Sequence, residues 1–301
     1  MNETEYEVII IGGSYSGLSA AMALGRSLRK TLVIDSGKPC NEQTPHSHNF
    51  LTQDGKTPKE ISESAKKQVS EYETVHLQEG KAIDAKKSES GFEITTENGE
   101  KFHSKKLIIA TGIVDEIPEI KGFKESWGIP LIHCPYCHGY EYKGKKTAII
   151  ANGDKAVHIS SLVKNLTEDV TLITRGKANF TDEQREKLNR NKIHIIETEV
   201  SELKNYSGMA ESIVFSDGTE IKFEAVYGAF PFHQHSEIPK KLGCEFTEFG
   251  HIKTDQFQKT NVPGVFVCGD NSSMMRSVSS AVMTGNVAGA MVNMELVTDC
   301  F

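Results

Sequence analysis

The apolar positions of the chain fall into short continuous runs separated by stretches of helical length. Near the start, the run 8–11 is followed by a glycine-rich turn, a helix-like stretch through residue 28 and a second apolar run over 31–35. Continuous runs of this kind are typical of parallel strands that are buried on both faces, with helices between them. The pattern predicts an α/β fold that opens with the strand–turn–helix–strand unit of a dinucleotide-binding domain.

The same order of elements occurs again in the middle of the chain. An apolar run at 147–150 leads into a polar turn, a helical stretch to about residue 165 and another apolar run at 170–174. Each copy continues with a β-hairpin signal, since Asn98-Gly99 and Asp217-Gly218 stand between strand-like segments and tolerate positive φ. The repeat predicts two Rossmann-like three-layer domains, each with a small β-meander.

The last part of the chain indicates that the second copy is inserted into the first. Residues 261–270 are typical of a turn and a short buried strand, and 281–297 of a buried helix, because polar residues interrupt the latter too often for a membrane span. We expect these elements to complete the first domain. The predicted division is a discontinuous first domain over 1–116 and 240–301, with a second domain over 117–239.

Composition narrows the classes of function. The 301 residues carry a formal net charge of −7 and no basic tract, so we expect neither nucleic acid nor a membrane surface as a partner. The first residues are acidic where a secretory signal needs a basic segment, which predicts a cytoplasmic protein. Cysteines in a reducing compartment rarely form structural disulfides, and a Cys-x-x-Cys there is more often catalytic or metal-binding.

The first turn has the glycine pattern that lets a dinucleotide approach the backbone. Gly12 permits the tight turn, Gly17 permits close packing of helix and strand, and Ser14 stands where a second glycine is usual. A pyrophosphate would lie at the helix N-terminus, where unpaired N–H groups favour an anion. Asp35 ends the next strand, 18 residues after Gly17, and is placed to accept hydrogen bonds from a ribose diol. These features predict a nucleotide site.

The second turn keeps only part of this pattern. Ala151 replaces the first glycine, Gly153 remains, and no acidic residue ends the next strand. Arg175 and Lys177 follow that strand instead, and basic side chains there can neutralise the 2′-phosphate of NADPH. Two interpretations stay open: an NADPH site that includes Gly153 and Arg175, or a degenerate turn with a solvated basic loop.

The most specific chemical signal is the pair Cys134 and Cys137, which are separated by two residues and followed at once by His138. This spacing lets two thiols close a small disulfide ring and often favours the thiolate that disulfide exchange requires. An imidazole beside the pair can donate or accept a proton as sulfur gains or loses charge. We expect these three residues to be catalytic, and we expect no metal.

Four other interpretations fit this segment less well. Attachment of haem c requires export. A zinc site lacks a second cysteine pair, and adjacent ligands cannot all face one metal. A glutaredoxin domain is much shorter and opens with its motif. A merely buried pair is disfavoured because two histidines flank the thiols.

The remaining candidates are weaker. The segment 45–51 is richer in polar and aromatic groups than a connecting loop needs, so we expect His48 and Asn49 to contact a cofactor, with an internally satisfied loop as the alternative. The isolated thiols are predicted to be core or incidental, and they are Cys40, Cys244, Cys268 and Cys300.

Over nearly its whole length the chain resembles the low-molecular-weight thioredoxin reductase family. The resemblance is carried by the glycine turn 12–17, by Ala110-Thr111-Gly112, by the cysteine segment 134–139 and by 264–270, which reads Gly-Val-Phe-Val-Cys-Gly-Asp. It implies FAD in the discontinuous domain, an NAD(P)-binding-like domain that carries the redox cysteines, and a homodimer.

The resemblance also implies individual roles. Cys137 would exchange electrons with the flavin, and Cys134 would attack the substrate disulfide. Asp270 would hold the ribityl chain. The other implied FAD contacts, the last three of them near the flavin ring, are Thr111, Gly112, Arg276, Ser277 and Val278.

The expected function is therefore that of an FAD-dependent oxidoreductase that passes electrons from NADPH, through FAD and the cysteine pair, to a thioredoxin-like protein or a small disulfide. Thioredoxin reductases usually have Asp where His138 stands, and His138 is similar to the dithiol oxidases that close disulfides in small molecules with oxygen as acceptor. Because the second turn is altered, a reductase that takes its electrons from ferredoxin or flavodoxin instead of NADPH is also an open alternative. A redox sensor without turnover is the non-enzymatic alternative.

Overall fold

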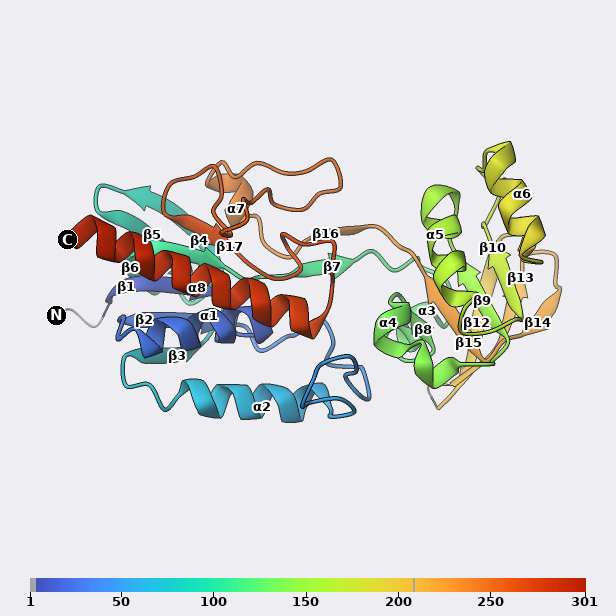
Figure 1. The fold of residues 1–301 in the computed structure, drawn as a ribbon, viewed down its shortest axis with the longest axis horizontal. Helices are drawn as coiled ribbons and strands as arrows, with labels where there is room; N and C mark the ends of the chain where they lie inside the picture. The colour runs from blue at the N-terminus through green and yellow to red at the C-terminus, as the bar shows by residue number, and fades with distance from the viewer. Residues whose placement is uncertain (1–3, 208) are drawn as a thin grey trace. The chain divides into compact units, whose positions relative to one another are not determined.

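The computed structural model describes residues 4–207 and 209–301, which form two compact units (Figure 1). The outer unit consists of the chain up to Glu42 together with Asn49–Val114 and Phe232–Phe301, and the inserted unit consists of Gln43–His48 and Asp115–Pro231. The chain therefore leaves the outer unit, builds the inserted unit and returns.

A sheet of seven strands forms the centre of the outer unit within the described residues. Its parallel part has the order β3-β2-β1-β6, with β17 also paired to β6, and β5 and β4 continue from β6 as an antiparallel meander. These strands are β1 (Glu5–Ile11), β2 (Thr31–Asp35), β3 (Val75–Glu79), β4 (Ala82–Ser88), β5 (Gly91–Thr96), β6 (Lys101–Ile109) and β17 (Val265–Val267).

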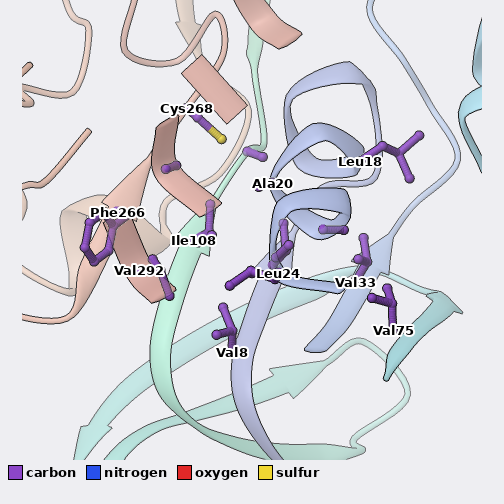
Figure 2. Close-up of a cluster of buried hydrophobic side chains, with 14 of the residues drawn as sticks. Val8, Leu18, Ala20, Leu24, Val33, Val75, Ile108, Phe266, Cys268 and Val292 are labelled. Atoms are coloured by element: carbon purple, nitrogen blue, oxygen red, sulfur yellow. The ribbon is translucent and has the colours of Figure 1, made fainter. Parts of the chain in front are cut away.

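Strands β1 and β2 are buried on both faces of this sheet, as their continuous apolar runs predict. Val8 and Ile10 of β1 belong to one hydrophobic cluster, and Ile9 and Ile11 belong to another on the opposite face. Helices α1 (Tyr15–Arg26) and α8 (Val278–Cys300) contribute to the first cluster, which Figure 2 shows. Strand β17 pairs with β6 and α8 packs on the first cluster, so the end of the chain lies in this unit.

Helices α8 and α1 lie side by side (Figure 1). Glycines at the contact let the two backbones approach closely. A Cβ on Gly285 would lie 2.1 Å from the carbonyl oxygen of Ser16, and one on Gly289 would lie 2.6 Å from that of Ala20. The opposite side of α8 exposes Met283 and Met294. The predicted buried helix is therefore buried on the side that faces α1 and exposed on this one.

The inserted unit is built on a second parallel sheet, with the order β11-β10-β9-β15-β8. A three-stranded antiparallel meander, β12-β13-β14, lies beside its core, and the predicted Asp217-Gly218 turn joins β13 to β14. These strands are β8 (Leu131–Ile132), β9 (Thr147–Ile150), β10 (Val170–Ile173), β11 (His194–Ile196), β12 (Val200–Tyr206), β13 (Met209–Phe215), β14 (Glu220–Lys222) and β15 (Ala225–Gly228). The predicted α/β fold with two Rossmann-type units is confirmed.

The remaining elements have at most four residues each, apart from three helices of nine to twelve residues. In the outer unit they are α2 (Pro58–Val69) and α7 (Ile238–Lys241), and in the inserted unit α3 (Phe123–Ser126), α4 (Pro135–His138), η1 (Tyr140–Tyr142), α5 (Gly153–Val163) and α6 (Asp182–Arg190). Strands β7 (Ile113–Asp115) and β16 (Phe232–Gln234) pair with each other. None of the helices in the described part of the chain has the length and apolar character that crossing a membrane requires.

The predicted domain boundaries differ from the two units in three places, the smallest being residues 115–116, which were predicted in the first domain and lie in the inserted unit. Residues 232–239, predicted in the second domain, lie in the outer unit, where Ile238 is part of the hydrophobic core. Residues 43–48, predicted in the first domain, lie with the inserted unit. These differences arise from tertiary packing after the chain changes direction, which local patterns do not record.

Candidate active site

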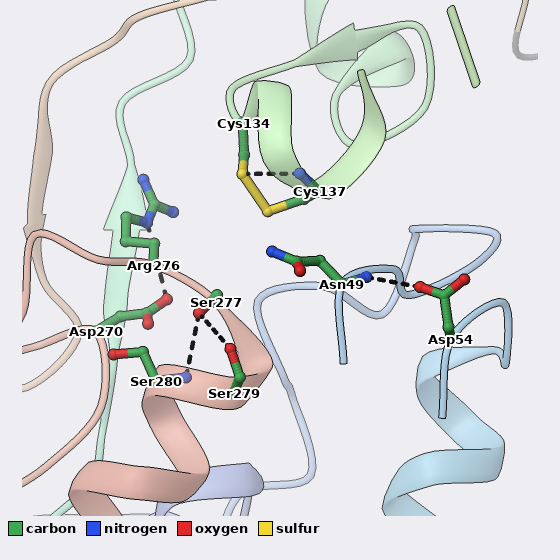
Figure 3. Close-up of a disulfide and its surroundings, with 9 residues drawn as sticks. All are labelled: Asn49, Asp54, Cys134, Cys137, Asp270, Arg276, Ser277, Ser279 and Ser280. Carbon is green, nitrogen blue, oxygen red and sulfur yellow. Dashed lines mark hydrogen bonds and ion pairs between the residues drawn. A yellow bond between two sulfur atoms is a disulfide. The ribbon is translucent and has the colours of Figure 1, made fainter. Parts of the chain in front are cut away.

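Cys134 and Cys137 form a disulfide in the inserted unit, with a Cα–Cα distance of 5.3 Å. Figure 3 shows the pair at the start of α4, where the backbone N–H of Cys137 donates a hydrogen bond to the sulfur of Cys134 at 3.1 Å. Cys134 is the N-cap of this short helix, and Pro135 occupies its first turn, where the missing N–H costs nothing. The predicted pair is therefore able to cycle between disulfide and dithiol.

Gly139 ends this redox turn for a steric reason. A Cβ there would lie 2.3 Å from the carbonyl oxygen of Pro135 and 2.4 Å from Cδ1 of Leu166. The backbone N–H of Gly139 donates to the same Pro135 carbonyl at 2.9 Å. The close approach holds the cysteine turn against the body of the inserted unit.

His138, which follows the second cysteine, is held in its neutral form. Both ring nitrogens are buried, and neither makes a hydrogen bond of standard geometry within the described residues. Burial lowers the pKa of His138, the charge of His48 lowers it further, and Glu141 and the backbone of His46 act in the opposite direction. A neutral imidazole at this place can accept a proton from a thiol.

The segment Gln43–His48 lies in the same unit as this histidine. Nε2 of His48 is 3.6 Å from the carboxylate of Glu141, and the rings of His46 and His48 are 6.3 Å apart. His48 was predicted to contact a cofactor, and the structure places it among the ionisable groups around His138. Asn49 is the first residue back in the outer unit, with a φ of 59° and its backbone N–H donating to Asp54 at 2.7 Å.

The other thiols do not share this chemistry. Cys268 is buried and burial raises its pKa to about 12, while burial also raises the pKa of Cys244. Cys40 and Cys300 lie outside the disulfide and are exposed. A thiol with a raised pKa carries little thiolate near neutral pH, so the structure supports Cys134 and Cys137 as the reactive pair.

The glycine turn of the outer unit has the close contacts that the pattern predicts. Gly12 has a φ of 105°, and a Cβ on Gly17 would lie 1.8 Å from the carbonyl oxygen of Gly12. The backbone N–H of Gly13 donates to Oδ1 of Asp35 at 3.1 Å, and Lys66 pairs with Oδ2 at 3.3 Å. Asp35 is thus fixed at the end of β2, where a ribose hydroxyl can still donate to it.

Ser14, Thr111 and Gly112 line the same end of the sheet. Ser14 is the N-cap of α1 and its side chain makes no capping bond. The hydroxyl of Thr111 and Oδ1 of Asn271 are buried and without a hydrogen-bond partner within the described residues. Gly112 follows with a φ of 66°. Unpaired N–H groups, a glycine-lined turn and two orphaned polar atoms fit the polar groups of FAD.

The start of α8 contributes the remaining predicted FAD residues. Arg276 pairs with Asp270 at 3.8 Å, and Ser277 caps α8 by accepting a hydrogen bond from the N–H of Ser280 at 3.1 Å (Figure 3). Val278 is the first residue of the helix. The N-terminus of α8 and Asp270 therefore lie in one unit with the glycine turn, while how each touches FAD stays a prediction.

The corresponding turn of the inserted unit is occupied by its own side chains. Asn152 caps α5 and bonds to Gly153 and to the loop that follows β10. Arg175, predicted to bind a 2′-phosphate, has a φ of 51° and its Nε lies 3.7 Å from the carboxylate of Glu199. These contacts do not fit a bound dinucleotide as they stand.

Several residues that contribute to the site were not identified from sequence patterns. Lys66 reaches Asp35 from α2, and Thr284 accepts the backbone N–H of Gly269 at 3.0 Å from α8. Glu141 acts on the pKa of His138, and its place three residues after His138 in the sequence is a signal that could have identified it. Among the described residues, no group of three or more His, Cys, Asp and Glu side chains is arranged to hold a metal ion.

Comparison with known proteins agrees with this geometry. The profile of the family described as pyridine nucleotide-disulphide oxidoreductase matches residues 6–285. "Thioredoxin reductase tcpT" of Claviceps purpurea is 32% identical over 97% of this chain and 95% of its own length. "Thioredoxin reductase aclD" of Aspergillus oryzae is 30% identical over 98% and 97%.

Solved structures agree as well. An oxidoreductase from Agrobacterium tumefaciens is 36% identical with a TM-score of 0.91, covering 98% of this chain and 99% of that one. A putative thioredoxin reductase TrxB from Bacillus anthracis is 28% identical with a TM-score of 0.93, covering 98% and 100%.

Proposed function

Because the chain belongs to the pyridine nucleotide-disulphide oxidoreductase family, as a thioredoxin reductase-like enzyme, we propose that Cys134 and Cys137 transfer electrons between FAD in the outer unit and a disulfide substrate. Enzymes of this family use FAD and NADPH, and FAD supplies the step that accepts and releases an electron pair. The disulfide on α4 is the observation that carries the proposal.

The cysteines exchange electrons with the substrate in two balanced steps. In the dithiol form, the thiolate of Cys134 attacks one sulfur of the substrate, which forms a mixed disulfide and releases the other sulfur as a thiolate. The thiolate of Cys137 then attacks Cys134, which restores the 134–137 disulfide and releases the second substrate sulfur. Two electrons and, after protonation, two protons have passed to the substrate.

His138 serves this exchange as a proton acceptor and donor. Its neutral imidazole takes the proton of a thiol that becomes a nucleophile, and the resulting imidazolium returns the proton to a leaving thiolate. Burial of both ring nitrogens keeps the proton within the site during the exchange.

Each of the two units is proposed to bind one cofactor. The outer unit holds FAD through Gly12, Ser14, Gly17 and Asp35, with Asn49, Thr111, Gly112, Asp270, Arg276, Ser277 and Val278 as further contacts. The inserted unit is the NAD(P)-binding-like domain, and the electron donor is NADPH. The buried thiols Cys244 and Cys268 favour a reducing compartment, and we place the enzyme in the cytoplasm.

The substrate is a thioredoxin-like protein or a small disulfide. Relatives of similar length carry the name thioredoxin reductase. Tyr136, between the two cysteines, and Tyr140, after them, are each 68% exposed and offer aromatic surface to a partner.

A homodimer is proposed for the assembled enzyme. The outward side of α8 exposes Met283, Met294 and Val297, which recur at helical spacing. Sedimentation velocity on the holoprotein tests this: a mass near twice that of one chain supports it, and a monomer across micromolar concentrations contradicts it.

An anaerobic titration tests the electron path. NADPH, NADH or a reduced flavodoxin is added to the yellow holoenzyme, and absorbance near the flavin maximum is followed before and after a disulfide substrate is added. Bleaching by NADPH and recovery with oxidised thioredoxin is expected. A purified chain that is colourless and binds no added FAD contradicts the proposal.

A second function is favoured by His138 and by the occupied turn at Asn152. The same cysteine pair run in reverse would oxidise a small dithiol, with the electrons passing to oxygen as peroxide. Release of peroxide with a dithiol and without nicotinamide distinguishes this function, and its absence across several dithiols excludes it.

A further inference from the structure

The side chain of Asn152 uses its full hydrogen-bonding capacity to close the turn between β9 and α5. Its Oδ1 accepts the backbone N–H groups of Gly153 and Asn179, each at 2.9 Å. Its Nδ2 donates to the carbonyl oxygens of Lys177 at 3.0 Å and Thr174 at 3.4 Å. An amide that satisfies two donors and two acceptors at once ties the turn to the loop 174–179.

This turn is where a dinucleotide would be bound in a Rossmann unit. The pyrophosphate lies at the N-terminus of the first helix and accepts its unpaired N–H groups, and glycine in the turn lets it approach the backbone. In the inserted unit, Oδ1 of Asn152 takes the N–H of Gly153, so a phosphate oxygen must compete for the same donor. The side chain also adds bulk at the position that Gly13 occupies in the turn of the outer unit.

The loop tied by Asn152 also contacts Glu197 and Glu199. The backbone N–H of Gly176 donates to the carbonyl of Glu197 at 2.6 Å, and that of Ala178 donates to its carboxylate at 2.8 Å. Nε of Arg175 is 3.7 Å from the carboxylate of Glu199. Two acidic side chains therefore occupy the surroundings of the loop that a 2′-phosphate would approach, which is unfavourable for an anion.

We propose that Asn152 is a specificity-determining residue of the inserted unit, whose amide closes the dinucleotide turn and lowers its affinity for NADPH. Binding of the nucleotide requires the four hydrogen bonds of this amide to break and the loop 174–179 to separate from the turn. Asn152→Gly removes the bonds and the bulk together. The inference rests on the proposed function only in taking the inserted unit as the nicotinamide domain.

The test measures binding rather than turnover. NADP⁺, which cannot reduce the flavin, is titrated calorimetrically into the FAD-loaded wild type and into Asn152→Gly, Asn152→Ala and Asn152→Asp. We expect the dissociation constant to fall about tenfold or more in the glycine variant, because several hydrogen bonds no longer compete. The alanine variant should show a smaller gain, and the aspartate variant should bind more weakly than wild type, because it keeps the acceptor and adds negative charge.

Asn191→Gly is the matched control, since it removes an exposed amide of the same unit that donates to the carbonyl of Lys187 at 2.8 Å. Its affinity should equal that of wild type. Circular dichroism melting of each variant verifies folding, and a glycine variant that is folded but binds NADP⁺ no more tightly than wild type, or not at all, overturns the inference. The proposed function fails separately, when dithionite-reduced wild type does not reduce a disulfide in a single turnover without nucleotide.

Discussion

The backbone N–H of Cys137 points at the sulfur of Cys134, with 3.1 Å between the nitrogen and the sulfur. A donor aimed at sulfur stabilises the thiolate over the thiol, so the arrangement prepares Cys134 as the attacking group once the disulfide is reduced. The assignment of Cys134 to the substrate and Cys137 to the flavin leads to the first prediction.

Replacement of either cysteine of the pair should abolish disulfide turnover while FAD stays bound. Cys134→Ser and Cys137→Ser each remove one of the two sulfurs that the exchange needs, and we expect turnover to fall about 10³-fold or more. The measurement is steady-state reduction of a disulfide together with the flavin absorbance spectrum. Cys300→Ser, which changes an exposed thiol outside the pair, should retain full turnover. A Cys134→Ser enzyme with wild-type turnover would refute the assignment.

Gly17→Ala should prevent FAD binding. The new Cβ would lie 1.8 Å from the carbonyl oxygen of Gly12, so the glycine turn must shift, at a cost of about 1–3 kcal/mol in the free energy of unfolding. Flavin content per chain, measured after purification with excess FAD, is expected to drop to near zero.

The control for this variant is Gly99→Ala in the hairpin turn. Gly99 has a φ of 82° and open space around its Cβ position, so alanine there costs only the left-handed backbone, about 1–2 kcal/mol. Its flavin content should equal that of wild type. Equal flavin loss in both variants would show that instability, rather than the shape of the turn, is the cause.

His138 should make stability depend on pH below neutrality. Its pKa in the folded chain is lowered by burial, whereas in the unfolded chain it returns to about 6.5. Between these two values the unfolded state binds more protons, so stability is lost as the pH falls through this window, by at most about 1.4 kcal/mol per pH unit.

Urea midpoints at pH 8 to 5 check this prediction. The wild type should lose stability more steeply than His138→Asn below about pH 6.5. The exposed His194→Asn should follow the wild type. Parallel curves for wild type and His138→Asn would contradict it.

Glu295→Gln should destabilise the outer unit. The carboxylate of Glu295 pairs with Lys106 at 2.9 Å and with Lys259 at 2.7 Å, and its side chain is only 23% exposed. Burial acts to raise its pKa, but the two lysines outweigh this and leave the pKa lowered. Its contribution is therefore present above about pH 4.3 and lost as the pH falls further.

Removal of this charge should cost about 1–2 kcal/mol, because it leaves two partly buried lysines with less compensation. Thermal and urea unfolding near pH 7 measure it. Glu186→Gln breaks an exposed pair with Arg190 on α6 and should change stability by less than about 0.5 kcal/mol. Equal effects of the two substitutions would show that burial of the Glu295 pairs does not matter.

Sequence patterns correctly predicted the structural features that depend only on residues close together in the chain. The glycine turn at Gly12, the hairpin at Asn98-Gly99 and the cysteine spacing are all contained in a few consecutive residues, and the structure has each of them. Helices α2 and α6 were not predicted, although both begin with a capping box, Thr57 with Glu60 and Thr181 with Gln184.

The contacts that the sequence did not disclose are those between distant segments. His48 lies with the inserted unit because the chain crosses to it for six residues, and no local pattern encodes that excursion. Asn152 occupies its turn through a loop that begins 22 residues later, at Thr174. Such contacts arise only when the whole chain has folded.

Helix α8 seats its glycines on α1, although more than 250 residues of chain separate them. A ribosome therefore releases every part of the inserted unit before the outer unit receives β17 and α8. Until then the apolar side of α1 stays uncovered. The inserted unit can fold while the outer unit still lacks β17 and α8. Chaperones that recognise apolar helices would therefore find this surface exposed for most of the synthesis, until α8 covers it.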